Sequence, residues 1–82
     1  MVKVVFYGRL ADLMGREREA PLGGASATVG DLMRRMAADE ADFAAALASM
    51  RVRYAVNDLM VTPEATVNAG DEIAVLPPFS GG

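Results

Sequence analysis

Thr28-Val29-Gly30-Asp31-Leu32-Met33-Arg34-Arg35-Met36-Ala37 is the segment with the most regular apolar pattern in the chain. Its apolar side chains recur three and four positions apart, which places them on one stripe of an α-helix. The hydroxyl of Thr28 can accept a hydrogen bond from an otherwise unpaired backbone amide, and the carboxylate of Asp31 suits the positive end of a helix. Methionines at this spacing are expected in a core rather than on a binding surface. We therefore expect this segment to be the principal helix.

Strand-forming segments lie on both sides of this helix. Residues 2–7 are β-branched or aromatic and apolar on both faces, so they predict a strand in the middle of a sheet. Residues 52–56 alternate in polarity, and the pair Asn57-Asp58 offers a tight turn into residues 59–61, which predicts a hairpin. Residues 72–76 predict a last strand, because the two prolines that follow it lack amide donors.

Shorter elements complete the prediction. Residues 10–14 have helical spacing, residues 16–22 contain a short strand that ends at Pro21, and residues 42–50 form a second short helix or an irregular helical loop. The chain of 82 residues is too short for a second domain. Four or five strands around one main helix make an α+β domain, which we place at residues 1–76.

Composition narrows the classes of function. No apolar run approaches the ~20 residues of a membrane span, and no secretion signal is recognisable, so we expect a cytoplasmic protein without a membrane partner. The formal net charge is −3 and the arginines are scattered along the sequence, which argues against a nucleic-acid partner. Without cysteine, neither a disulfide nor a thiolate metal site can form.

The side chains that most often perform catalysis are missing, because the chain has no histidine, cysteine or tryptophan. Imidazole bases, thiolate nucleophiles and Cys/His zinc sites are therefore excluded. Asp39, Glu40 and Asp42 lie where one helix is expected to end and another to begin, so we expect capping and solvation rather than cation binding. No phosphate-binding glycine motif is present. We expect no metal site, no cofactor bound by this chain and no catalytic machinery of its own.

The C-terminal tail Pro77-Pro78-Phe79-Ser80-Gly81-Gly82 is the remaining candidate for chemistry. Its prolines favour an extended, stiff exit from the last strand, and six residues reach about 20 Å. The final glycines carry no Cβ, so they fit a narrow channel and leave the Gly82 carboxylate open to attack. A carboxylate reacts only after activation, which we expect from a separate enzyme that forms an acyl-adenylate with ATP. Residues 77–82 are thus predicted to project from the domain.

At these residues the sequence resembles the small subunits of molybdopterin synthase, which are ubiquitin-like β-grasp sulfur carriers. The resemblance covers nearly the whole chain, in the order and spacing of the motifs as well as in their identities. The motifs that carry it are Val2-Lys3-Val4-Val5-Phe6-Tyr7, Ala27-Thr28-Val29-Gly30-Asp31-Leu32, Ala55-Val56-Asn57, Ala69-Gly70-Asp71-Glu72-Ile73-Ala74 and the tail.

The resemblance implies a mixed β-grasp sheet of about five strands packed on the helix that begins at Thr28. It implies that an E1-like activating enzyme adenylates Gly82, using ATP and Mg, and that a sulfur donor protein then provides the sulfur of a thiocarboxylate. In that family the tail inserts into the large synthase subunit, within a heterotetramer, and donates sulfur to precursor Z (cyclic pyranopterin monophosphate) for molybdenum cofactor biosynthesis. Gly82 would be the sulfur donor and residues 77–81 the inserted segment, with Phe79 beside the glycines.

The same resemblance marks an apolar, partner-facing surface at Tyr7, Met60 and Leu76. We expect Leu76 on this surface rather than in the core, because Ile73 and Val75 already occupy the opposite face of the strand. Tyr7 and Met60 fit either position.

Other functions fit the same features. A carrier of the thiazole (thiamin) pathway shares the fold and the Gly-Gly end, although Pro77-Pro78 and the longer insert at residues 39–50 favour the molybdopterin branch. A ubiquitin-like modifier joined to target lysines, or a carrier that performs both tasks, is a second alternative. A plain interaction domain with disordered glycines is a third.

Overall fold

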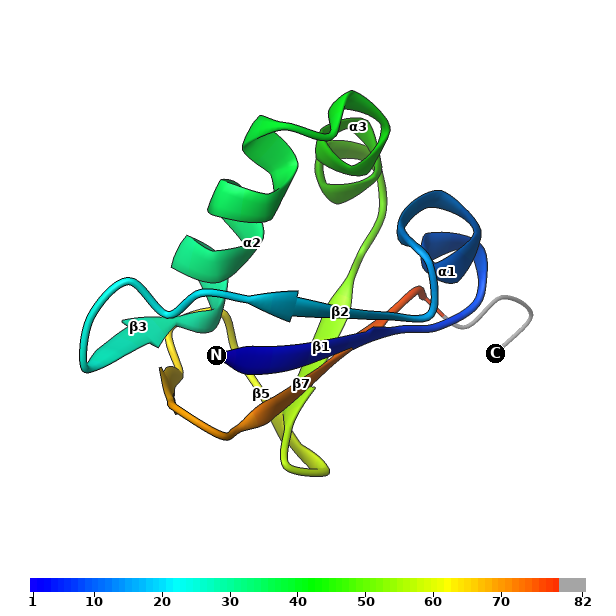
Figure 1. Ribbon diagram of the computed structural model, residues 1–82. Helices are drawn as coiled ribbons and strands as arrows, with labels where there is room; N and C mark the ends of the chain where they lie inside the picture. The colour runs from blue at the N-terminus through cyan, green and yellow to red at the C-terminus, as the bar shows by residue number, and fades with distance from the viewer. Residues whose placement is uncertain (79–82) are drawn as a thin grey trace.

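The structure is a computed structural model that describes residues 1–78 (Figure 1). The predictions for Phe79, Ser80, Gly81 and Gly82 lie outside the described residues. The elements in chain order are β1 (Val2–Phe6), α1 (Arg9–Met14), β2 (Glu17–Ala20), β3 (Ser26–Thr28), α2 (Val29–Ala38), α3 (Ala41–Ser49), β4 (Arg53–Val56), β5 (Leu59–Val61), β6 (Thr66–Asn68) and β7 (Glu72–Leu76).

Five of the strands form one mixed sheet in the order β2-β1-β7-β4-β5. β1 and β7 are parallel neighbours, with Val4 opposite Ile73, and the other pairs in this sheet are antiparallel. β3 and β6 form a separate two-stranded sheet. The helices α1, α2 and α3 all lie on one side of the main sheet (Figure 1). The predicted α+β class and the mixed five-stranded sheet are confirmed.

The core lies between the main sheet and the helices. Alternate side chains of β1 and β7 point into it, because successive residues of a strand face opposite sides. Phe6 of β1 meets Phe43 of α3 edge to face, with ring centres 5.6 Å apart. Among the described residues no polar or charged side chain is buried, so apolar burial and packing hold the core together. The largest fully buried side chains are Phe43, Leu10, Leu32, Ile73, Val2, Val4, Val29, Val67 and Val75.

α2 begins as the sequence predicts. Thr28 has extended backbone angles, and its Oγ1 accepts a hydrogen bond from the Asp31 backbone N–H at 3.1 Å. This cap satisfies one of the amides that the start of a helix leaves unpaired. Met33 is buried and Met36 packs half-buried against the core, which confirms the core position predicted for both.

The structure also departs from the prediction in places. The strands β3 and β6 were not expected, because each spans three residues and only Val67 among them is fully buried. β1 lies inside the sheet as predicted, but the helices cover only one of its faces, so Lys3 is exposed and Val5 half-buried. Residues 42–50, for which a helix and an irregular loop were both open, belong largely to the regular helix α3.

A polar network ties the predicted hairpin turn to the start of β7. Asn57 and Asp58 have φ angles of 50° and 69°, as a two-residue turn of type I′ requires. The Asn57 side chain accepts from the Glu72 N–H at 3.1 Å and donates to Asp71 Oδ1 at 3.0 Å. Asp71 Oδ2 accepts from the Asn68 N–H at 2.8 Å. The backbone bond from Asn68, followed by the side-chain bond from Asn57, lowers the pKa of Asp71.

Acid should therefore weaken the fold through Asp71. Because the fold lowers the pKa of this carboxyl, its stabilising effect is complete above the ordinary value of 3.8 and is lost as the pH falls through the folded pKa. We expect the urea midpoint of the wild type to decrease below about pH 4. The decrease should be shallower in Asp71→Asn, whereas the control Asp12→Asn, an exposed position of α1, should follow the wild type. Equally steep decreases in all three proteins would contradict this role.

Candidate functional site

The candidate site is the point where β7 ends and the tail begins. β7 lies between β1 and β4, so its last residues are fixed from both sides. The Tyr7 N–H donates to the Val75 carbonyl at 3.1 Å, just beyond the end of β1. Pro77 is half-buried and Pro78 is exposed. The strand ends where the sequence predicts, because neither proline can donate to a neighbouring strand.

Gly8 contacts the first residue of the tail. Its φ is +57°, a backbone conformation that residues with a side chain rarely adopt. A Cβ at this position would lie 2.9 Å from Pro77 Cγ, closer than a van der Waals contact allows. The ring of Pro77 therefore packs against the backbone of Gly8, between β1 and α1. This contact constrains the direction in which the chain leaves β7.

A hollow of about 270 Å³ lies beside this contact. It is lined by Pro77 and Pro78, by Arg9 at the start of α1, and by Met50 directly after α3. Three of the four lining side chains are apolar and the fourth is a guanidinium. The hollow can thus accept an apolar group that is accompanied by a negative charge.

The sheet face that the helices leave open carries the predicted partner surface. Leu76 is half-buried there, while Ile73 and Val75 on the opposite face are fully buried, as the alternation predicts. Met60 of β5 is 51% exposed, and Tyr7, just after β1, is 46% exposed. None of these three predicted interface residues is therefore a core residue. Their role in binding a partner stays a prediction.

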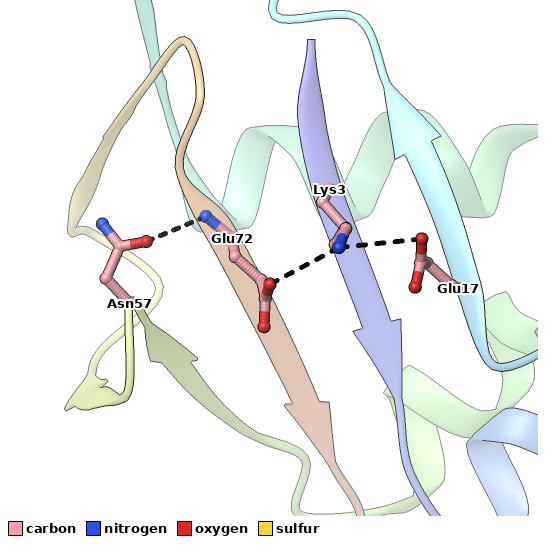
Figure 2. Close-up of polar contacts among 4 residues, drawn as sticks. All are labelled: Lys3, Glu17, Asn57 and Glu72. Carbon is pink, nitrogen blue, oxygen red and sulfur yellow. Dashed lines mark hydrogen bonds and ion pairs between the residues drawn. The ribbon is translucent and has the colours of Figure 1, made fainter.

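At the other end of the open face, Lys3 lies between two carboxylates (Figure 2). Its Nζ is 3.8 Å from Glu17 Oε2 on β2 and 3.9 Å from Glu72 Oε1 on β7. The three side chains are about half exposed, so these ion pairs add little to stability. Figure 2 also shows the Glu72 N–H that donates to Asn57. The lysine is held near the start of β7, away from the tail.

Comparison with known proteins gives the family. The sequence model of the ThiS family matches residues 4–82. The chain belongs to the ThiS family. It is 33% identical, over 82 residues and 100% of both chains, to the molybdopterin synthase sulfur carrier subunit of Escherichia coli (strain K12). The resemblance carried by the sequence motifs is thereby confirmed.

Solved structures similar to this ThiS-family chain confirm the ubiquitin-like β-grasp fold. SAMP1 from Haloferax volcanii has a TM-score of 0.78 at 24% identity, covering 99% of this chain and 98% of that one. A chain of the Amycolatopsis orientalis BexX/CysO complex has a TM-score of 0.76 at 29% identity, with both chains covered completely. Several differently named proteins share this fold, so the fold alone does not identify the pathway.

The acidic residues between α2 and α3 have structural positions in this ThiS-family chain. Asp39 is the C-terminal cap residue of α2, Asp42 lies in the first turn of α3, and Glu40 Oε1 pairs with Arg18 Nη1 at 2.8 Å. Asp39 and Asp42 are exposed at the helix ends, as predicted, whereas Glu40, the N-cap residue of α3, makes no side-chain capping bond and is held in the ion pair instead. Within residues 1–78, no group of three or more His, Cys, Asp or Glu is placed to hold a metal ion. No helix in the same range is long and apolar enough to cross a membrane.

Sequence reasoning missed Gly8, Arg9 and Met50 at this site. In the sequence, Gly8 indicates only the end of a strand, and its contact with Pro77 joins positions near opposite ends of the chain. No local pattern can report such a contact. The one sequence signal that could have indicated this contact is the glycine directly before a helical segment, because the start of a helix does not itself require glycine.

Replacing Gly8 should destabilise the ThiS-family domain and displace Pro77. Gly15 gives a matched control, because its φ is also positive, +86°, but a Cβ there would meet nothing within 4 Å. Backbone strain alone predicts that Gly15→Ala lowers the free energy of unfolding by about 1–3 kcal/mol. Gly8→Ala should lower it by roughly 1 kcal/mol more, because Pro77 must also move. Urea denaturation followed by circular dichroism measures both losses, and equal losses would contradict the importance of the Pro77 contact.

Proposed function

We propose that this chain is the sulfur carrier subunit of a molybdopterin synthase and that its working group is the Gly82 carboxylate. The observation that carries the proposal is the end-to-end identity of 33% with the Escherichia coli subunit of that name. The tail that contains Gly82 follows directly on β7, a strand inside the sheet. Tyr7 and Gly8 fix the start of that tail through their contacts with Val75 and Pro77.

Activation is the first chemical step. In an E1-like enzyme, a carboxylate oxygen of Gly82 attacks the α-phosphorus of Mg-bound ATP, which forms the acyl-adenylate and releases pyrophosphate. The outer sulfur of a persulfide on a donor protein then attacks the acyl carbon, and AMP leaves. A second thiol attacks the donor-side sulfur of the resulting acyl disulfide, which forms a disulfide with the donor and releases the C-terminus as a thiocarboxylate. This chain contributes no imidazole or thiol to these steps, because its sequence has neither histidine nor cysteine. ATP, Mg and the catalytic side chains therefore belong to the activating enzyme.

Sulfur transfer is the second step and takes place in the large synthase subunit. The tail enters the active site of that subunit, and the thiocarboxylate sulfur attacks an electrophilic carbon of the pterin precursor and displaces an oxygen substituent from it. Water then cleaves the bond between sulfur and the acyl carbon, which restores the Gly82 carboxylate. Each thiocarboxylate supplies one sulfur, so two carriers in turn supply the two sulfurs of the dithiolene. In the extended conformation that insertion of the tail requires, six residues would span about 20 Å from Leu76. The folded domain therefore serves to bind the large subunit and to aim the tail, in a heterotetramer of two such pairs.

The alternatives differ in what accepts the activated tail. A thiazole-pathway carrier forms the same thiocarboxylate but passes sulfur to another acceptor. A protein modifier instead forms an isopeptide bond with a lysine of its target. Pro77-Pro78 and the insert at residues 39–50 favour the molybdopterin branch, and the reaction products decide among the three.

Removing the Gly82 carboxylate should abolish activation and leave the fold intact. We expect no thiocarboxylate from a chain without Gly82, or from the full chain with a C-terminal amide, after incubation with activating enzyme, Mg-ATP and sulfur donor. The amide keeps every residue and so isolates the carboxylate. The wild type should gain the mass of one sulfur in place of one oxygen by intact-mass spectrometry. Both variants should unfold within about 0.5 kcal/mol of the wild type, since a chain end adds little burial.

Three results would contradict parts of this proposal. Sulfur transfer by the chain without Gly82 would exclude the C-terminal carboxylate as the working group. Lysine-linked adducts without a thiocarboxylate would identify a modifier. When the large subunit and the precursor are added to the thiocarboxylate form, we expect the dithiolene pterin. Sulfur transfer in a thiazole-forming system, without any dithiolene pterin, would assign the carrier to the thiazole pathway instead.

Met60→Glu should weaken binding to the large synthase subunit without unfolding the carrier. Met60 is half exposed on the open face, so a carboxylate there is hydrated in the free carrier and loses that hydration in the complex. Leu59→Glu is the matched control, because Leu59 is 70% exposed and the alternation of β5 directs it to the other face. We expect Kd to rise about tenfold for Met60→Glu and less than about threefold for Leu59→Glu in titration calorimetry. Equal effects would place the interface elsewhere.

A further inference from the structure

Three arginines lie on segments that adjoin the end of β7, although the chain carries a net charge of −3. Arg9 begins α1 and lines the hollow beside Pro77. Arg53 begins β4 and stands opposite Leu76, the last residue of β7. Arg51 lies two residues before Arg53, in the segment that connects α3 to β4. We call Arg9, Arg51 and Arg53 the arginine collar.

The positive charge of the collar is not neutralised within the described part of the chain. All three arginines are exposed. In contrast to Arg18, which pairs with Glu40, no collar arginine has a carboxylate oxygen within 4.0 Å among residues 1–78. Asp12, one turn further along α1, forms no such pair with Arg9. The collar therefore presents three hydrated guanidinium groups that can still bind carboxylates.

The opposite end of the sheet is acidic. Asp58 lies in the turn between β4 and β5, and Asp71 and Glu72 lie at the start of β7. The long axis of β7 thus runs from a negative end to the positive end that carries the tail. Such a charge distribution turns the tail toward a negative surface during a diffusional encounter.

The collar does not reach the Gly82 carboxylate when the tail is inserted in a channel. Insertion requires an extended tail, whose six residues would span about 20 Å from Leu76, whereas an arginine side chain extends roughly 7 Å, the length of two residues. When the tail is inserted into a channel, the collar lies at the mouth. Arg9 lines the apolar hollow beside Pro77, and Arg53 lines a second hollow together with Met60. Guanidinium groups beside apolar surface fit carboxylates that flank an apolar side chain.

We propose that the arginine collar docks the carrier on an acidic rim around the tail channel of the activating enzyme. The inference rests on the proposed function, because it takes insertion of the tail as given. The activating enzyme must release the carrier after every activation, and exposed charge pairs raise the association rate without the deep burial that slows release. The surface of Tyr7, Met60 and Leu76, which adjoins Arg53, offers apolar area for a lasting contact with the large subunit.

Charge reversal tests the collar. Arg9→Glu and Arg53→Glu are compared with Arg34→Glu, which makes the same charge change at a side chain of α2 that is 74% exposed. Pyrophosphate release by the activating enzyme with Mg-ATP is measured over a range of carrier concentrations at low and high salt. At low salt, kcat/KM should fall about tenfold or more for both collar variants, and by less than about twofold for Arg34→Glu. Both kcat at saturating carrier and the urea midpoint should stay unchanged.

Salt supplies the second readout, because screening should lower the wild-type kcat/KM toward that of the collar variants. Equal effects of all three reversals, or a wild-type rate that salt leaves unchanged, would overturn the docking role. A loss of kcat at saturating carrier would also overturn it. Unchanged activation with weaker binding to the large subunit would assign the rim to the synthase instead. A wild-type chain that yields no pyrophosphate is a distinct result, because it overturns the proposed function and the inference with it.

Discussion

β1 and β7 are the first and last strands of the chain, and they pair in parallel inside the sheet. Parallel neighbours cannot be joined by a tight turn, so the whole chain between them has to form the connection. That connection provides the helices that cover one face (Figure 1) and the strands that extend the sheet beyond β7. With β1 on one side and β4 on the other, β7 delivers the tail from a strand that is hydrogen-bonded along both edges.

The same pairing explains which residues meet at the site. Parallel strands end at the same edge of a sheet, so residues 7–9, which follow β1, necessarily lie beside residues 77–78, which follow β7. The bond from Tyr7 to Val75, the packing of Gly8 on Pro77 and the place of Arg9 in the hollow are three results of this one geometry. In the proposed function, a single tail serves two enzymes, so activation and sulfur delivery must alternate.

Local patterns in the sequence predicted the elements that bury a regular stripe or end at a distinctive residue. The helix that starts at Thr28, the turn at Asn57 and the end of β7 before Pro77 are all of this kind. The strands β3 and β6 are too short to show a period, and β3 runs directly into the cap of α2. The exposure of one face of β1 could not be predicted from the sequence either. An apolar run does not indicate whether helices will cover one of its faces or both.

The candidate site was only partly accessible from the sequence, for a related physical reason. The terminal glycines can be seen in the sequence as a chemical feature, and the alternation along β7 assigned Leu76 to the open face correctly. The arginines are scattered in the sequence and form no cluster there. The fold brings Arg9 and Arg53 to the same end of the sheet, because the end of β1 and the start of β4 both lie beside the end of β7. Proximity of this kind is a property of topology and not of composition.

The two ends of the chain leave the domain at opposite edges of the sheet, since β1 starts where β7 starts. Met1 is exposed and its carbonyl accepts from the Gly70 N–H, whereas the tail departs beside α1, a full strand length away. At about 3.3 Å per residue, the five residues of β1 separate these two points by roughly 16 Å. A purification tag or fluorescent fusion attached to Met1 is therefore carried at the end of the sheet remote from Pro77. Surface immobilisation through the N-terminus likewise presents the end of β7 outward, which makes the carrier suited to the capture of enzymes that bind its tail.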